Sequence, residues 1–250
     1  MPRFFVTSTQ IENGVVTILG DDARHISRAL RMAVGERITV CDMARTEYEC
    51  ELCEFLPDRV KATVLSSLSS NTEPPVHVTL YQALPKGDKL DSVIQKAVEC
   101  GVSRIRTFES ERCVVRAKPD AEAHKTERRA RIALEAAKQC GRGAIPEVLP
   151  TVSFSAMLQE AAAADLVLFC YEGDGVVPLG RLLAEKRPAP GSSLAVVIGS
   201  EGGFSKDEVA RACEHGFCMT GLGPRILRTE TASGFALACI SCMLELGALD

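Results

Sequence analysis

The sequence has no run of 18 consecutive apolar residues, so it predicts no membrane-spanning helix. Polar residues soon interrupt the short apolar patch within Met1–Phe5, which is not the pattern of a signal peptide. With no export signal we expect a cytoplasmic protein, whose eleven cysteines stay reduced and serve as small buried hydrophobic residues. The 250 residues, 46% of them hydrophobic, suffice for one large or two modest packed domains.

The sequence also lacks a convincing metal-binding motif. Cys50 and Cys53 fall in a stretch that reads as a strand, where residues three apart point to opposite faces. Cys239 and Cys242 share a helix face, but that face continues to Leu246 and is apolar, as expected of core packing. We therefore predict no metal.

Two motifs that bind nucleotide phosphates are missing as well. The glycine-rich stretch 199–203 lacks the lysine that ends a P-loop, and it lies far from the first βαβ unit, where a dinucleotide fingerprint belongs. What is present is a β-branched run, Ala195–Ile198, that reads as a buried parallel strand and breaks at Gly199. Ligands bind beyond the carboxyl ends of such strands, and glycine backbone approaches them closely. The pattern favours a phosphate-free adenosine ligand; a loop that merely turns the chain into the next helix is the alternative.

The chain divides into two predicted domains, residues 1–70 and 71–250. The first is β-rich, with expected strands at 4–7, 15–19, 37–42, 47–55 and 59–65 and one helix at about 21–32. Residues 66–75 are polar, contain a Pro-Pro pair and read as a linker. From residue 76 strands and helices alternate, which predicts an α/β domain with a mostly parallel sheet covered on both faces. The expected strands there are 76–84, 104–108, 166–171, 194–198 and 218–222, and the expected helices are 90–100, 121–140, 155–164, 179–186, 206–215 and 231–246.

Two glycine-containing motifs near the C-terminus carry a family resemblance. IGSEGGFS (198–205) and LGPRILRTETA (222–232) together resemble the C-terminal signature of the RsmE-type 16S rRNA (uridine-N3) methyltransferases, members of the SPOUT class. The resemblance runs along the chain, through residues 2–5, 25–31, 86–89 and 110–115. Two residues depart from it: Ser200 stands where the family often has proline, and Lys138 stands where glutamate is usual. Neither departure removes a glycine from the two motifs.

The resemblance implies a fold and a function. The fold is a SPOUT-type parallel sheet with a C-terminal trefoil knot, preceded by a small PUA-like β-barrel that binds RNA. The function is transfer of a methyl group from S-adenosylmethionine to N3 of a uridine in 16S rRNA of the small ribosomal subunit, by a homodimer. A non-catalytic RNA-binding protein, a methyltransferase for a different RNA and a nucleotide-dependent enzyme are the alternatives; titration with S-adenosylmethionine, NAD and ATP separates cofactor use from the others.

The same resemblance supplies candidate site residues. The expected cofactor-binding residues lie in the two motifs: Gly199, Glu201, Gly202, Gly203, Leu222, Gly223, Ile226, Leu227, Arg228 and Thr231. Because the N3 proton of uridine must leave, Glu201 is the candidate base and Arg228 the candidate stabiliser of the anion. The alternatives are that Glu201 only accepts backbone hydrogen bonds in its loop and that Arg228 only binds phosphate. Thr229 and Thr231 either cap the last helix or contact the ligand.

RNA contacts are expected from arginines outside the two motifs. The candidates are Arg3, Arg24, Arg28, Arg31, Arg112 and Arg142. Arg24, Arg28 and Arg31 are spaced to share one face of the predicted helix at 21–32. The segment 104–142 holds 11 basic and 6 acidic residues, a net charge of +5 in a chain whose formal net charge is −4. That excess fits a surface that follows phosphates, and a solvated helix face is the alternative.

Overall fold

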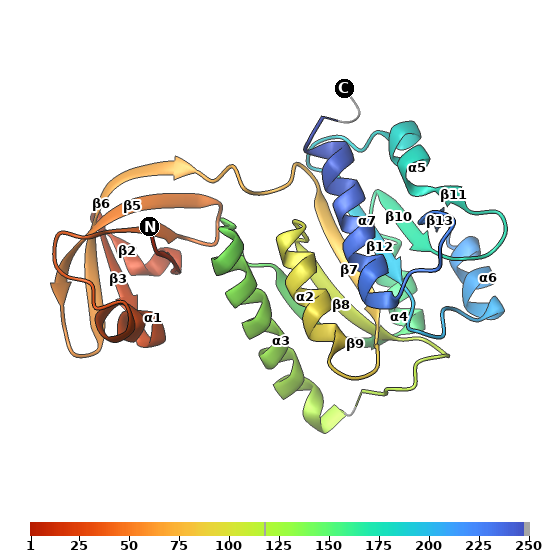
Figure 1. Cartoon of the computed structure of the whole chain (residues 1–250), viewed down its shortest axis with the longest axis horizontal. Helices are drawn as coiled ribbons and strands as arrows, with labels where there is room; N and C mark the ends of the chain where they lie inside the picture. Colours follow the sequence, from red (N-terminus) through yellow and green to blue (C-terminus); the bar gives the residue numbers. More distant parts are fainter. Residues whose placement is uncertain (118, 248–250) are drawn as a thin grey trace. The chain divides into compact units, whose positions relative to one another are not determined.

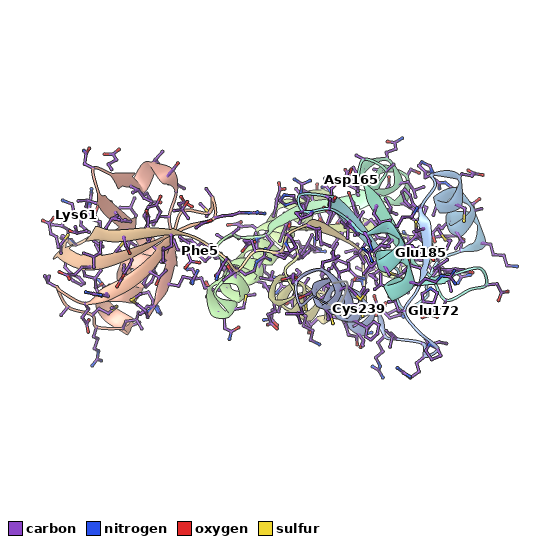
Figure 2. The ribbon with its side chains drawn as sticks, turned by 90° about the horizontal axis from the view of Figure 1, so that it is seen from above. Phe5, Lys61, Asp165, Glu172, Glu185 and Cys239 are labelled. Carbon is purple, nitrogen blue, oxygen red and sulfur yellow. The ribbon has the colours of Figure 1, made fainter. Side chains whose placement is uncertain are left out.

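The computed structural model describes residues 1–117 and 119–247 (Figure 1). The chain forms two compact units. The first contains Met1–Glu73 together with Ala137–Ile145, and the second contains Pro74–Ala136 and the chain from Pro146 onward. The N-terminal unit therefore includes a short segment from the middle of the sequence, which composition and periodicity had not predicted.

The N-terminal unit is built on a six-stranded sheet of order β1-β4-β5-β6-β3-β2. β1 and β4 are parallel, and the other neighbours are antiparallel. Burial alternates along β3, where Val16 and Ile18 point into the core, as period-two patterning requires. The strands are β1 (Arg3–Phe5), β2 (Ile11–Glu12), β3 (Val15–Leu19), β4 (Arg37–Cys41), β5 (Thr46–Phe55) and β6 (Arg59–Ser69).

Two local expectations for this unit were wrong. Residues 66–69, predicted as linker, extend β6, because their backbones pair with residues 46–49 of β5 although three of the four residues are serines. The predicted helix at 21–32 is instead a short α1 (Gly20–Arg24) that continues as the π-helical turn η2 (His25–Ala29). Arg31 has a φ of 52°, so the helix ends before it.

The second unit contains a seven-stranded sheet of order β11-β13-β10-β12-β7-β8-β9, in which every neighbouring pair is parallel. Its central strands are almost continuously apolar and buried, as strands covered on both faces must be. The strands are β7 (His77–Ala83), β8 (Arg104–Glu109), β9 (Glu147–Ser153), β10 (Leu166–Cys170), β11 (Val177–Pro178), β12 (Ser193–Ile198) and β13 (Cys218–Gly221). The predicted α/β class is confirmed; β9 and β11, each interrupted by a proline, were not predicted.

Helices connect these parallel strands. They are α2 (Lys89–Glu99), α3 (Pro119–Cys140), α4 (Phe154–Ala161), α5 (Leu179–Lys186), α6 (Lys206–Glu214) and α7 (Thr229–Leu244). The C-terminal α7 packs against β12 and lies beside α2 (Figure 1). This packing brings the start of α7 to the carboxyl ends of β7 and β12, where the two glycine motifs lie.

Candidate functional site

The first glycine loop, residues 199–205, follows β12 and is anchored at its far end by an aromatic cluster. Phe204 is 5% exposed, and its ring centroid lies 4.2 Å from that of Phe169 and 6.4 Å from that of Phe108. The next residue, Ser205, caps α6 in a capping box with Glu208. The loop therefore leaves a buried strand and returns to a fixed helix start, which restricts the backbone between them.

A second segment, residues 110–113, packs against this loop. Nη1 of Arg112 donates to the carbonyl O of Gly202 at 3.0 Å, and the buried Glu208 accepts from the backbone N–H of Glu111 at 2.8 Å. A Cβ on Gly202 would lie 2.9 Å from Cβ of Arg112, so only glycine fits there without movement. Gly203 has a φ of 63°, which also favours glycine. Arg112, predicted to contact RNA, thus holds the first glycine loop.

Glu201 is held by the loop between β7 and α2. Its Oε1 accepts from the backbone N–H of Lys86 at 3.1 Å and from Nζ of Lys89 at 2.7 Å. Desolvation on its own would raise the pKa of Glu201, but the hydrogen bonds from Lys89 and Lys86 outweigh it and lower that pKa. These contacts correspond to the loop-binding alternative for Glu201 rather than to a free base.

The second glycine loop, residues 222–228, is open to solvent. Gly223 has a φ of 103°, and Ile226 is 82% exposed, while Leu222 and Leu227 are half-buried. Arg228 ends the loop as the N-cap residue of α7. Its guanidinium is exposed and forms no ion pair or hydrogen bond within the described parts of the chain. Arg228 is therefore a free cation at the rim of the site.

Behind the two loops lies a buried polar cluster that sequence reasoning missed. Oγ1 of Thr229 donates to the carbonyl O of Gly199 at 2.6 Å, and Nε2 of Gln82 lies 2.9 Å from the same hydroxyl. The signal that could have revealed it is a glutamine within the apolar run 76–84. Thr229 thus contacts the other loop rather than capping α7, whereas Thr231 is exposed and its backbone N–H bonds to the carbonyl O of Arg228.

Two of the predicted RNA-binding arginines, Arg3 and Arg142, form ion pairs within the chain. Arg142 forms a bidentate ion pair with Glu73, with side-chain exposures of 5% and 4%, and its carbonyl accepts from Arg3. Arg3 itself makes a bidentate pair with Glu47, at 2.9 and 3.1 Å. All four residues belong to the N-terminal unit. Their charges are matched within it, so neither Arg3 nor Arg142 offers a free cation to a phosphate.

The remaining candidates on the N-terminal unit differ from one another. Arg24 pairs with Asp21 one turn before it. Arg28 lies in the π-helical turn and Arg31 beyond it, both exposed. Because the helix changes type at His25 and Arg31 is left-handed, the predicted single arginine face is not formed. Arg28 and Arg31 remain as exposed cations without a partner in the described residues.

Most of the basic excess in 104–142 is neutralised within the chain. Arginines and a lysine of this segment pair with carboxylates as Arg104–Glu147, Arg106–Glu160, Arg116–Glu109, Arg128–Asp91, Arg129–Glu122, Lys138–Asp22 and Arg142–Glu73. Five of these seven carboxylates, all except Glu109 and Glu122, lie outside the segment. The net charge of +5 therefore overstates the basic surface that the segment could offer to phosphates.

The prediction that the cysteines are buried holds for only some of them: Cys41, Cys50 and Cys113 are buried, whereas Cys53, Cys140, Cys213 and Cys242 are exposed. Cys50 is fully buried while Cys53 is exposed, as opposite faces of β5 require. Among residues 1–117 and 119–247, no three His, Cys, Asp or Glu side chains gather as a metal-binding group. Within the same residues, no helix has the length and apolar character needed to cross a bilayer.

Known proteins resemble this chain over nearly its whole length. The model of the RNA methyltransferase domain matches residues 72–241, which include both glycine loops. Ribosomal RNA small subunit methyltransferase E of Bacillus subtilis is 38% identical over 252 residues, with 98% of each chain covered. The chain belongs to this methyltransferase family. The Mycobacterium bovis member is 30% identical, with 96% of this chain and 91% of that protein covered.

A solved structure of the same family extends the comparison. Ribosomal RNA small subunit methyltransferase E from Neisseria gonorrhoeae, crystallised with S-adenosyl methionine, aligns with a TM-score of 0.82 at 31% identity, covering 97% of this chain and 98% of that one. The family fold therefore includes the N-terminal unit, of which only residues 72–73 and 137–145 lie within the methyltransferase domain match.

Proposed function

We propose that this chain transfers a methyl group from S-adenosylmethionine to N3 of a uridine in 16S rRNA of the small ribosomal subunit. The observation that carries the proposal is the contact between the two glycine motifs beyond the carboxyl end of β12, where Thr229 of the second motif donates to the carbonyl O of Gly199 in the first. Family members named for small-subunit rRNA methylation, one of them crystallised with S-adenosyl methionine, support it.

The residues present fit the cofactor. Gly202 and Gly223 lie where backbone, rather than side chains, faces the loop surfaces, and the apolar side chains of Leu222, Ile226 and Leu227 provide partly exposed walls for an adenine ring. Gly199, Gly203 and Thr231 complete the proposed cofactor-binding set. When bound, S-adenosylmethionine supplies an activated methyl group on a sulfonium.

The protein's own contribution to the reaction is placement and charge. As N3 of uridine loses its proton, negative charge spreads to the ring oxygens, and the free guanidinium of Arg228 is positioned to stabilise it. Its planar fork also suits two oxygen acceptors at once. Glu201 already accepts hydrogen bonds from Lys86 and Lys89, so we propose that it shapes the first loop rather than removing the proton.

The finer architecture is part of the same proposal. Residues 1–70 form a PUA-like RNA-binding barrel, and residues 71–250 form a SPOUT domain whose C-terminal segment makes a trefoil knot. Exposed apolar residues on α7 and its preceding loop, Phe235 and Ile226, fit a homodimer in which a second copy covers this face. Arg28 and Arg31 reach rRNA phosphates, and the enzyme acts in the cytoplasm, where small subunits assemble.

Two measurements test the function. Calorimetry should show binding of S-adenosylmethionine but not of NAD or ATP at the same concentrations. Incubation with small subunits from cells lacking this methyltransferase should then yield one N3-methyluridine in 16S rRNA, detected by mass spectrometry of nuclease fragments. Binding of RNA without binding of S-adenosylmethionine would indicate a non-catalytic RNA-binding protein, and methylation of another RNA would change the substrate.

A further inference from the structure

One buried side chain joins strand β7 to both glycine loops. Gln82 is 0% exposed and lies opposite Ile198 in the parallel pairing of β7 with β12. Its Nε2 lies 2.9 Å from Oγ1 of Thr229, 3.0 Å from the carbonyl O of Ala83 and 3.4 Å from the carbonyl O of Gly199. Gly199 opens the first loop and Thr229 directly follows the second, so Gln82 contacts the ends of both.

The directions of these hydrogen bonds follow from the partners. The carbonyl oxygens of Ala83 and Gly199 can only accept, so the amide nitrogen of Gln82, not its oxygen, faces them. Thr229 lies 2.6 Å from the carbonyl of Gly199 and must donate to it. Its hydroxyl oxygen therefore accepts from Gln82. The result is a single directed chain from the Gln82 amide through the Thr229 hydroxyl to the Gly199 carbonyl.

Fold stability alone does not account for a glutamine at this position. Oε1 of Gln82 is buried without a hydrogen-bond partner among the described residues, as is Oγ of Ser200 next to Gly199. A buried acceptor without a donor destabilises a fold, and an apolar side chain of similar length would avoid that penalty. The contacts that remain as a reason for glutamine are those to Thr229 and Gly199.

We infer that Gln82 is a positioning residue for methyl transfer: through Thr229 it fixes the placement of one glycine loop relative to the other. Its effect on cofactor binding rests on the proposed function, whereas the coupling of the loops does not. A directed chain of hydrogen bonds in a buried site loses its orientation when one member is removed. Replacing either Gln82 or Thr229 should therefore be sufficient to break the chain.

Four single variants and one double variant test this role. Thr229→Val keeps the side-chain shape without the hydroxyl, and Thr229→Ser retains the hydroxyl. Gln82→Met keeps the length without the amide. Thr107→Val is the matched control, because Thr107 is a buried threonine of β8 whose hydroxyl bonds to Thr151 of β9 at 2.7 Å. Thr107 lies beside Gln82 in the pairing of β7 with β8 but forms no hydrogen bond with its side chain among the described residues, so it tests whether loss of any neighbouring hydroxyl has the same effect.

The first measurement is hydrogen exchange of the protein without cofactor. In Thr229→Val and in Gln82→Met, backbone amides of residues 199–203, 223 and 225–228 should exchange about tenfold faster, together in both loops. Thr229→Ser and Thr107→Val should match the wild type in these loops. Faster exchange in one loop only, or in neither, would overturn the inference.

The second measurement is affinity for S-adenosylmethionine by calorimetry. Thr229→Val and Gln82→Met should each weaken binding about tenfold. The double variant that combines these two substitutions should bind no more weakly than either single variant, because all three break the same chain of hydrogen bonds. The melting temperature of Gln82→Met should stay equal to that of wild type or rise. Unchanged affinity, or additive losses, would contradict a positioning role. Failure of the wild type itself to bind S-adenosylmethionine would refute the proposed cofactor. The hydrogen-exchange data would still test whether Gln82 couples the two glycine loops.

Discussion

The ammonium of Lys89 lies 2.7 Å from Oε1 of Glu201 and 3.9 Å from Oε2 of Glu230. Lys89 begins α2, Glu201 lies in the first glycine loop and Glu230 lies in the first turn of α7. One cation therefore connects three elements that meet at the site. Lys89 thus links the first glycine loop electrostatically to the start of α7, in addition to the hydrogen bond between Thr229 and Gly199.

The contacts of Glu201 predict how methyl transfer depends on pH. Since its folded pKa is below the ordinary glutamate value, the stabilisation from Lys89 and Lys86 is complete above about pH 4.3 and is lost only as the pH falls through the lowered pKa. Between about pH 5 and pH 9, the single-turnover rate should therefore depend on pH in the same way for the wild type and for Glu201→Gln. The variant should bind S-adenosylmethionine more weakly, as calorimetry will measure. Disappearance of the acidic limb, the fall in rate at low pH, from the profile of Glu201→Gln would instead identify Glu201 as the base.

Arg228 is expected to act as charge develops in the reaction. Arg228→Lys keeps the positive charge but loses the planar fork, so single-turnover methylation should fall about a hundredfold while affinity for S-adenosylmethionine changes little. Arg225→Lys, on the same exposed loop, is the matched control and should retain nearly the wild-type rate. A parallel loss of cofactor affinity in Arg228→Lys would place Arg228 in the binding pocket. Wild-type turnover would leave it no essential role.

Gly202 is expected to tolerate no side chain. A Cβ there meets Arg112 at 2.9 Å, so Gly202→Val must displace the 110–113 segment or the loop, and binding of S-adenosylmethionine should be lost while circular dichroism shows a retained fold. Gly180→Ala in α5 is the control, because nothing lies within 4 Å of the new Cβ. Unchanged affinity in Gly202→Val would remove this loop from the cofactor site.

Arginines of the N-terminal unit should separate into two classes. Arg28→Gln removes an exposed cation and should reduce the slope of log affinity against log salt for rRNA by about one, leaving the melting temperature unchanged. Filter-binding titrations over a range of salt concentrations give this slope. An unaltered slope would exclude a phosphate contact at Arg28.

Arg142→Met is the opposite case. It leaves Glu73 buried and uncompensated, so we expect a loss of about 3–5 kcal/mol in unfolding free energy, measured by urea denaturation. The salt slope of the protein that remains folded should equal that of wild type. A lower slope with unchanged stability would restore Arg142 to the RNA-binding set.

The sequence alone determined the class of the second unit and the place of its two glycine loops. Parallel strands covered on both faces need continuous apolar runs, so Ala195–Ile198 and Leu166–Cys170 can be recognised as such strands from their composition. The breaks at Gly199 and Gly223 then mark where the backbone turns out of the sheet. These are local properties of short segments, which is why they can be read without a structure.

Only the tertiary structure decided which charged and polar side chains are free. Arg142 and Arg228 look alike in the sequence, yet one is buried against Glu73 and the other is exposed at the start of α7. Gln82 meets Thr229 across 147 positions of sequence, and Lys89 meets Glu201 across 112. Local pattern fixes the period of burial along a segment, but the partner of a polar group depends on which distant segment packs against it. Which distant segment packs there depends on the packing of the whole core, so a single stretch of sequence cannot predict the partner of a polar group.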